Sequence, residues 1–227
     1  MLSIVVPVYN EEGALPGFLA MIDAAAPDCE LVFADGGSVD ATLSLLAGRT
    51  VVQGAKGRGA QIRVGVARAA GDELLVLHAD ARIDRAGICA VRRALRAGAP
   101  WGCLTLRFDD GALVYRAGAW VSNMRVALWG IAFGDQAMFF RRSVLEAVGG
   151  VPDLPLMEDY ELSRRLRAQV GRPCRLKEPV LTSARRFQQG GPYRQAFLMR
   201  RLRRDYRAGV PIEDLAARYA DVRKGRP

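Results

Sequence analysis

Short hydrophobic runs alternate with amphipathic stretches through the N-terminal half of the chain, and three of these runs lead directly into acidic side chains. The runs cover residues 4–8, 31–34 and 74–77, and the acids that follow them are Glu11, Asp35 and Asp80. Continuous apolar runs of this length are typical of buried parallel strands. Ligands of open α/β sheets bind beyond the carboxyl ends of such strands. We therefore expect the three acids to converge on one site.

Apolar residues at helical spacing fill the segments between these runs. The pattern predicts helices over 12–25, 39–46, 60–69 and 84–96, and a short strand over 50–52. Ser38 and Asp84 are the expected N-caps of the second and fourth helices.

The second half predicts strands over 102–108, 137–140 and 175–182, and helices over 113–129, 143–148, from 157 onward, 193–208 and 212–219. Strands and helices alternating in this way indicate an α/β fold with a mostly parallel, doubly wound sheet. We expect one domain over residues 1–190 and a basic helical extension packed on it over residues 191–227.

Composition narrows the partners only slightly. The formal charge of +9 comes from 33 Lys and Arg against 24 Asp and Glu, which permits binding to phosphates or anionic lipids. A general bias toward Arg, Ala and Gly accounts for the charge equally well. No helix-turn-helix or aromatic RNA-binding signature accompanies it, so nucleic acid is not an expected partner.

The four cysteines are widely spaced, which argues against a zinc site or a disulfide framework and favours buried thiols of a cytoplasmic protein. Met1 leads straight into the first strand, and no run approaches the roughly 18 apolar residues of a membrane span. We expect a cytoplasmic protein.

His78 and Asp80 are the first candidates for chemistry, because they stand two positions apart at a predicted strand end. A divalent cation held there could neutralise a diphosphate leaving group. Alternatively, Asp80 caps a turn and His78 is a hydrogen-bonded core imidazole. His78 is the one histidine of the chain, so neither a histidine metal cluster nor a Ser-His-Asp triad with a second histidine is available.

Two further segments have both a chemical and a structural explanation. Residues 54–59 form a glycine-rich basic loop that opens a helix and could bind a phosphate, although a surface turn explains them about as well. Glu158 and Asp159 begin a helix, where the helix dipole favours acids whatever their role. Asp159 could also accept a proton from a hydroxyl nucleophile.

Taken together, these motifs resemble the family 2 glycosyltransferases of the GT-A fold. The matching segments are 4–12, 35–40, 78–80 and 157–162, and the likeness extends from residue 2 to about residue 219. It is closest to a bacterial subgroup associated with radical SAM proteins and selenodomains, on the segments 57–61, 108–110, 134–136, 154–159 and 183–187.

The resemblance implies a nucleotide-sugar site that is built from eight residues. Pro7 and Tyr9 would line the nucleobase, Glu11 would bind the ribose, and Asp35 would bind the edge of the base. Lys56, Arg58 and Gln61 would lie near the diphosphate. Asp80 would hold the metal ion. The metal would be Mn²⁺ or Mg²⁺. The family's first metal-binding acid is His78 here, an imidazole that suits Mn²⁺ better or only hydrogen-bonds a phosphate.

The resemblance also implies the catalytic and acceptor groups. Asp159 matches the catalytic base of the family, and the acceptor side would comprise Asp135, Gln136, Glu158, Arg185 and Arg186. Phe187 stands after the last strand, where the family usually has Trp.

The implied activity is that of a hexosyltransferase, which moves a sugar from a UDP- or GDP-sugar to an acceptor hydroxyl by a metal-assisted, inverting single displacement. Two alternatives stay open: a sugar nucleotidyltransferase, and a nucleotide-binding protein without catalysis. Six arginines between residues 194 and 207 alternate with apolar residues. Such a helix could contact an anionic membrane, which would suit a lipid-linked acceptor, or could be a solvated basic face.

Overall fold

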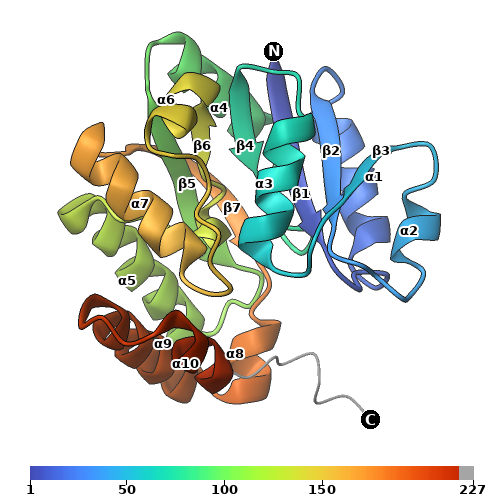
Figure 1. Cartoon of the computed structure of the whole chain (residues 1–227). Helices are drawn as coiled ribbons and strands as arrows, with labels where there is room; N and C mark the ends of the chain where they lie inside the picture. The colour runs from blue at the N-terminus through green and yellow to red at the C-terminus, as the bar shows by residue number, and fades with distance from the viewer. Residues whose placement is uncertain (220–227) are drawn as a thin grey trace.

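The computed structural model describes residues 1–219, apart from the side chains of Arg186 and Gln189, and its centre is a seven-stranded sheet (Figure 1). The strand order is β3-β2-β1-β4-β6-β5-β7, and every neighbouring pair is parallel except those that involve β6. The strands are β1 (Leu2–Val8), β2 (Glu30–Asp35), β3 (Thr50–Gln53), β4 (Glu73–Val76), β5 (Trp101–Phe108), β6 (Phe139–Arg141) and β7 (Cys174–Thr182). The predicted α/β class and mostly parallel sheet are confirmed.

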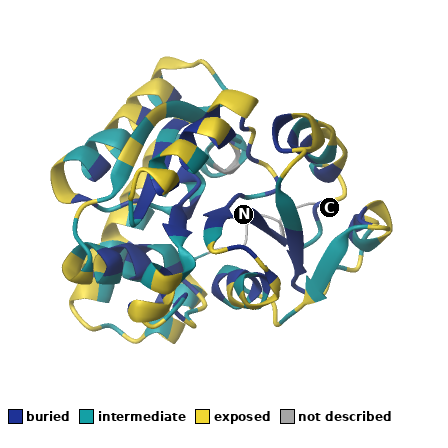
Figure 2. Ribbon diagram, turned by 90° about the horizontal axis from the view of Figure 1, so that it is seen from above, coloured by how far each residue is buried: buried dark blue, intermediate teal, exposed yellow. Residues whose placement is uncertain are grey.

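Helices cover both faces of the sheet, because successive residues of a strand point to opposite sides. Leu2, Ile4, Val6 and Val8 of β1 face one hydrophobic cluster, whereas Val5 faces the other. Helices α1 (Leu15–Ala25) and α4 (Arg85–Arg96) pack into the first cluster, and α3 (Arg58–Arg68), α5 (Leu113–Trp129), α6 (Arg142–Ala147) and α7 (Glu158–Gln169) into the second. Figure 2 shows the buried strands enclosed by helices with exposed outer faces.

Most of the predicted helices form within a few residues of their expected bounds, and Asp84 caps α4 as expected by accepting a hydrogen bond from the Gly87 amide. The expected N-cap role of Ser38 is wrong. Helix α2 (Thr42–Leu45) begins three residues later than predicted, after Ala41, with no side-chain cap. The Ser38 hydroxyl instead donates to Asp35, so the turn after β2 uses the group that would have capped a helix.

The C-terminal segment forms three helices: α8 (Arg185–Gly190), which the sequence pattern did not predict, α9 (Pro192–Arg207) and α10 (Ile212–Arg218). A third hydrophobic cluster joins Leu202 and Leu215 of these helices to Leu156, Met157 and Tyr160 around the start of α7. The C-terminal helices therefore lie against the carboxyl end of the sheet (Figure 1). Residues 220–227 of the predicted extension lie outside the described part of the chain.

None of the helices in residues 1–219 combines the length and the hydrophobicity needed to cross a bilayer.

Gly65 of α3 faces β1, and its missing side chain lets the helix pack closely against the strand. A Cβ added at Gly65 would overlap Cγ1 of Val5 and would lie 3.3 Å from Cβ of Ala34. The glycine therefore fixes the spacing between the helix that begins at Arg58 and the strands that end near Glu11 and Asp35.

We expect Gly65→Ala to lower the free energy of unfolding by about 1–3 kcal/mol, because overpacking forces a helix away from its strand. The matched control is Gly17→Ala in α1, where an added Cβ meets nothing within 4 Å. That variant should gain about 0.5–1 kcal/mol from helix propensity. Urea unfolding followed by circular dichroism measures both, and equal effects of the two substitutions would contradict the close approach.

Candidate active site

Strained backbone positions lie beside several of the predicted site residues. Three residues other than glycine have positive φ in the described part of the chain: Asn10 (52°), Ala137 (49°) and Met157 (67°). Each lies beside candidate site residues, namely Glu11, Gln136 and Glu158. Left-handed backbone outside glycine is costly, and such positions often cluster at functional sites.

Asp35 organises the loop after β2. Its carboxylate is fully buried and accepts hydrogen bonds from the backbone amides of Gly37, at 2.9 Å, and of Ser38. Glu11, also buried, is held nearby through a hydrogen bond from its backbone amide to Thr42. Both acids thus lie where expected, at the ends of β2 and β1, and their binding roles stay predictions.

Gln61 joins two strands rather than pointing to solvent. Its side-chain amide is buried and donates to the carbonyl oxygens of Val8 at 2.6 Å and Ala34 at 3.0 Å. These bonds satisfy carbonyl groups at the carboxyl ends of β1 and β2. Pro7 is likewise buried, within β1.

Tyr9 and Lys56 lie together at the rim of this loop cluster. The Nζ atom of Lys56 is 4.0 Å from the centroid of the Tyr9 ring, within the range of a cation–π contact. An aromatic ring and a flexible cation are thus adjacent.

Asp159 occupies the first turn of α7, and backbone groups fix its orientation. Its Oδ2 atom accepts a hydrogen bond from the Gly134 amide at 2.9 Å, and its Oδ1 atom accepts one from the Tyr160 amide at 2.6 Å. A Cβ added at Gly134 would lie 3.0 Å from Nε2 of His78 and 3.4 Å from Oδ2 of Asp159. The imidazole and the predicted base therefore flank the same glycine.

Glu158 forms an ion pair with Arg58 across the gap between α7 and α3. The side chain of Glu158 is only 3% exposed, and its Oε1 atom lies 2.8 Å from Nε of Arg58. Burial raises the pKa of Glu158, and the guanidinium opposes that shift, while Glu158 raises the pKa of Arg58. Arg58 also interacts electrostatically with Asp159 and Asp135, so it is one of the cations of this acidic cluster.

Asp135 has a buried oxygen without a protein partner. Its Oδ1 atom makes no hydrogen bond with the described residues. Burial raises its pKa to about 6; Arg125 opposes that shift, and the charges of Asp159 and Asp80 add to it. Asp135 thus interacts electrostatically with both Asp159 and Asp80.

Gln136 is fully buried and structural in its contacts. Its Oε1 atom accepts hydrogen bonds from Arg125 at 2.8 Å and from the Phe133 amide at 3.2 Å. It fixes the 3₁₀ turn Gly134–Gln136, which carries Asp135.

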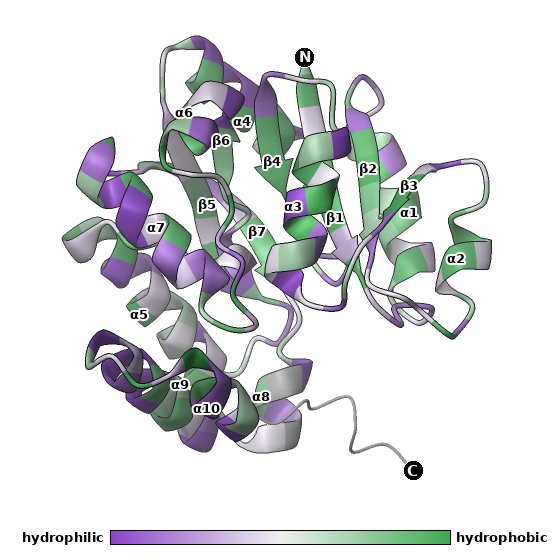
Figure 3. Ribbon diagram, in the orientation of Figure 1, coloured by the Kyte–Doolittle hydropathy of each residue, from purple (hydrophilic) through white to green (hydrophobic). Residues whose placement is uncertain are grey.

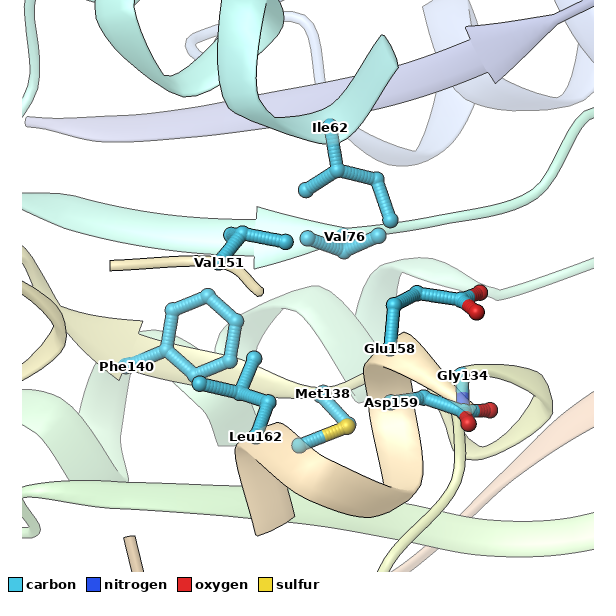
Figure 4. A pocket seen from close by; sticks show the side chains of 9 residues that line it. All are labelled: Ile62, Val76, Gly134, Met138, Phe140, Val151, Glu158, Asp159 and Leu162. Carbon is cyan, nitrogen blue, oxygen red and sulfur yellow. The ribbon is translucent and has the colours of Figure 1, made fainter. Parts of the chain in front are cut away.

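A small apolar cavity lies behind the two acids of α7. Figure 4 shows Ile62, Val76, Val151, Phe140, Met138 and Leu162 around it, with Glu158, Asp159 and Gly134 at one side. The walls come from α3, α7 and the strands β4 and β6. Apolar walls reduce solvent access to the carboxylates and so strengthen their electrostatic interactions.

Arg185 opens α8 after the last strand, and the backbone there is tied to the end of β5. The Ala184 amide donates to Oδ1 of Asp109 at 2.8 Å, and the rings of Phe187 and Phe108 lie 5.3 Å apart. The side chain of Arg186 lies outside the described residues. The acceptor role predicted for both arginines stays a prediction.

Comparison with known proteins identifies the family. The family model described as "Glycosyl transferase family 2" matches residues 3–149. The chain belongs to glycosyltransferase family 2. Among curated proteins, the undecaprenyl-phosphate 4-deoxy-4-formamido-L-arabinose transferase of Aeromonas hydrophila is 34% identical over 94 residues, which is 35% of this chain and 29% of that protein. The chain thus covers less than a third of that relative.

Solved structures show that the fold is the GT-A fold of glycosyltransferases. S. aureus TarS 1-349 in complex with UDP-GlcNAc gives a TM-score of 0.64 at 17% identity, over 80% of this chain and 58% of that one. Glucosyl-3-phosphoglycerate synthase from Mycobacterium tuberculosis, in complex with Mn²⁺, UDP and glucosyl-3-phosphoglycerate, gives a TM-score of 0.64 at 18% identity. That match covers 93% of this chain and 81% of the synthase chain. The mannosyltransferase PcManGT from Pyrobaculum calidifontis, in complex with GDP-Man and Mn²⁺, gives a TM-score of 0.63 at 20% identity. That match covers 88% of this chain and 60% of the mannosyltransferase chain.

Two arginines of this family 2 glycosyltransferase contribute to the site although the sequence analysis did not assign them to it. Arg125 of α5 lies 3.5 Å from the centroid of the Phe133 ring, and burial lowers its pKa to about 10. Arg203 of α9 lies 5.3 Å from the same ring and interacts electrostatically with Asp159. The one signal for Arg125 in the sequence is that it is one of only two charged residues in a helix that is otherwise uncharged.

The raised pKa of Asp135 predicts a pH-dependent stability. The Asp135 carboxyl has a pKa of about 6 in the folded protein, whereas its ordinary pKa in an unfolded chain is 3.8. Between these two pH values the folded protein holds a proton that the unfolded chain releases, so the free energy of unfolding falls as pH rises through this interval. We expect Asp135→Asn to become more stable than the wild type as pH rises, on the order of 1 kcal/mol at neutral pH.

Urea unfolding in the presence of EDTA, repeated at several pH values, measures this difference. The control is Asp153→Asn, because the side chain of Asp153 is 69% exposed. A stability difference for Asp135→Asn that does not vary with pH would show that burial does not perturb this carboxyl.

Proposed function

We propose that this chain is an inverting glycosyltransferase that moves a sugar from a UDP- or GDP-sugar to an acceptor hydroxyl, with Asp159 as the general base. The observation that carries the proposal is the fixed carboxylate of Asp159 within the cluster that includes Asp80, Asp135 and Arg58, in a chain of this family. Asp159 would take the hydroxyl proton as the acceptor oxygen attacks the anomeric carbon and the nucleoside diphosphate departs.

The loop cluster at β1 and β2 is suited to the nucleotide. Tyr9 would stack on the base and Glu11 and Asp35 would bind ribose and base, while Lys56 would approach the diphosphate. The pairing of Lys56 with the Tyr9 ring supports this arrangement, because both groups face the same rim. The buried hydrogen bonds of Gln61 give it a positioning role at this site: it holds the strand ends that carry the loop.

A divalent cation fits the donors at the end of β4. Asp80 offers an exposed carboxylate and His78 an imidazole, a donor set that suits Mn²⁺ at least as well as Mg²⁺. The described residues contain no group of three or more His, Cys, Asp or Glu side chains able to hold a metal. Such a cation supplies positive charge that stabilises the departing diphosphate.

The acceptor is proposed to be carried by a lipid. The curated relative is named as an undecaprenyl-phosphate transferase, which supports this class of acceptor. The outward face of α9 combines exposed Tyr193 and Phe197 with five exposed arginines: Arg194, Arg200, Arg201, Arg204 and Arg207. Purple and green positions alternate along this helix in Figure 3. This face of α9 would bind an anionic membrane surface. The residues on the acceptor side of the site would be Asp135, Glu158, Arg185 and Arg186.

We further infer that the chain belongs to the bacterial subgroup associated with radical SAM proteins and selenodomains. The segments 57–61, 134–136 and 154–159 support this placement. The structure gives them a common context, because Arg58, Asp135 and Glu158 form one charged cluster.

Asp159→Asn is expected to reduce turnover by about 10²–10⁴-fold, the usual contribution of general base catalysis, with little change in nucleotide binding. The assay is sugar transfer from a panel of UDP- and GDP-sugars to polyprenyl-linked and soluble acceptors, with nucleoside diphosphate affinity measured by calorimetry. Asp153→Asn is the matched control. Full turnover by Asp159→Asn would remove the residue from catalysis, and pyrophosphate release from a sugar phosphate and a nucleoside triphosphate would favour a nucleotidyltransferase.

Asp80→Ala is expected to abolish the effect of Mn²⁺ on nucleoside diphosphate affinity, because it removes the carboxylate that would hold the ion. Calorimetric titrations with Mn²⁺ and with EDTA give the comparison. Asp72→Ala is the control, since Asp72 is exposed before the start of β4, away from its carboxyl end. If Asp80→Ala retains the metal dependence of the wild type, Asp80 is not a ligand.

A further inference from the structure

Two arginines from different helices lie against one aromatic ring beside the site. The guanidinium carbon of Arg125, in α5, is 3.5 Å from the centroid of the Phe133 ring, and that of Arg203, in α9, is 5.3 Å from it. Phe133 immediately precedes Gly134, whose backbone amide donates a hydrogen bond to Asp159. The two guanidinium groups therefore stand next to the proposed catalytic base.

Neither guanidinium group is paired with a carboxylate in the described part of the chain. Arg125 donates its hydrogen bonds to neutral groups, namely the carbonyl oxygen of Ile131 at 3.0 Å and Oε1 of Gln136 at 2.8 Å. Arg203 makes no hydrogen bond with the described residues, and it contacts the ring of Phe133 instead. Two positive charges are thus left without a counter-charge in direct contact.

The acids at the start of α7 are held by other partners. Both carboxylate oxygens of Asp159 accept hydrogen bonds from backbone amides, those of Gly134 and Tyr160. Glu158 forms its ion pair with Arg58. The two guanidinium groups beside the Phe133 ring therefore keep most of their hydrogen-bonding capacity for a ligand.

Holding these two cations close together has an electrostatic cost. Burial lowers the pKa of Arg125 and of Arg203; Asp135 opposes the shift of Arg125, whereas the charge of Arg203 adds to it. Both arginine side chains are partly exposed, so a ligand can reach them. An anion bound to both would relieve their repulsion through charge-assisted hydrogen bonds, and the planar guanidinium matches phosphate in a bidentate geometry.

We propose that Arg125 and Arg203 bind a phosphate group that belongs to the acceptor, next to the hydroxyl that Asp159 deprotonates. A phosphate monoester carries about 1.5–2 negative charges at neutral pH, which matches two cations. The donor diphosphate has its own proposed groups, Lys56 and the cation at Asp80, in the loops after β3 and β4.

The inference rests on the proposed function in one respect: the phosphate is assigned to the acceptor because the arginine pair adjoins the proposed base. The acceptor would thus be a phosphorylated molecule, either soluble or linked to a lipid through that group. These two sources share one chemistry, and the experiments below distinguish them.

The first test is a calorimetric titration of the full chain with inorganic phosphate, with and without a saturating nucleoside diphosphate. The nucleotide keeps phosphate out of the donor site, so the remaining binding reports on the arginine pair. We expect Arg203→Gln to weaken this binding at least about tenfold, because it removes a charged donor from the anion. Arg203→Lys keeps the charge without the planar fork, so its affinity should lie between those of Arg203→Gln and the wild type.

The matched control is Arg96→Gln, which removes the same charge from an exposed position. Arg96 is the last residue of α4 and leads into the start of β5, away from the carboxyl ends of the strands. This control should bind phosphate as the wild type does. Thermal melting checks that each variant is folded, and nucleoside diphosphate affinity should be unchanged in all of them.

The second test distinguishes the source of the phosphate. Glycerol 3-phosphate and glucose 6-phosphate are the soluble probes, and polyprenyl diphosphate in detergent micelles is the lipid-linked one; all are titrated in the presence of the nucleotide. We expect at least one of them to bind more tightly than inorganic phosphate and to lose affinity in Arg203→Gln. If none does, the site holds a free anion only, which overturns the assignment to the acceptor.

Three further results would overturn the inference. One is phosphate affinity in Arg203→Gln equal to that of the wild type. Another is an equal loss in Arg96→Gln, which would show that net charge alone attracts the anion. The third is complete displacement of phosphate by the nucleoside diphosphate, which would assign the arginines to the donor. Phosphate binding that depends on Arg203 without sugar transfer from any donor would overturn the proposed function and leave the anion site intact.

Discussion

The ion pair between half-exposed Arg58 and buried Glu158 is the interaction on which the site depends. Arg58 is the first residue of α3, and Glu158 is the first residue of α7, so the pair joins the starts of two helices that belong to different halves of the chain. The loss of Arg58 would leave the buried carboxylate of Glu158 without its cation, which is destabilising. The pair therefore fixes the next residue, Asp159, relative to the loop that leads into α3.

The carboxyl edge of the sheet brings the remaining groups to this point. Parallel strands deliver their following loops to one edge, so Glu11, Asp35 and Asp80 reach it from separate places in the sequence. The antiparallel strand β6 reverses this direction, and the turn before it therefore presents Asp135 to the same edge. One reversal in an otherwise parallel sheet thus adds the second half of the chain to the site.

The C-terminal helices pack against the start of α7 and also place a side chain beside the site. Leu202 and Leu215 pack against the residues before and within the first turn of α7, and Arg203 reaches Phe133 beside Arg125. Three arginines, Arg58, Arg125 and Arg203, consequently surround the carboxylates of Asp135 and Asp159. An acceptor that approached Asp159 would meet groups of both the sheet domain and the C-terminal helices.

The sequence by itself determined the α/β class, the parallel rhythm of the strands and the acidic strand ends. These features follow from local periodicity and from the rule that ligand sites lie beyond the carboxyl ends of parallel strands. It also indicated Asp80 and Asp159, because their neighbours match ordered motifs. It misplaced Ser38, since the competition between capping a helix and holding the Asp35 turn is decided by contacts across loops.

Only the tertiary structure decided the direction of side chains on helices whose pattern was ambiguous. Arg125 turns toward the site from a largely apolar helix, while Trp120 and Trp129 of the same helix face solvent. Arg203 turns inward although its arginine neighbours on α9 are exposed. Helical spacing gives the angle between two side chains, but which side meets the sheet depends on partners that are distant in sequence.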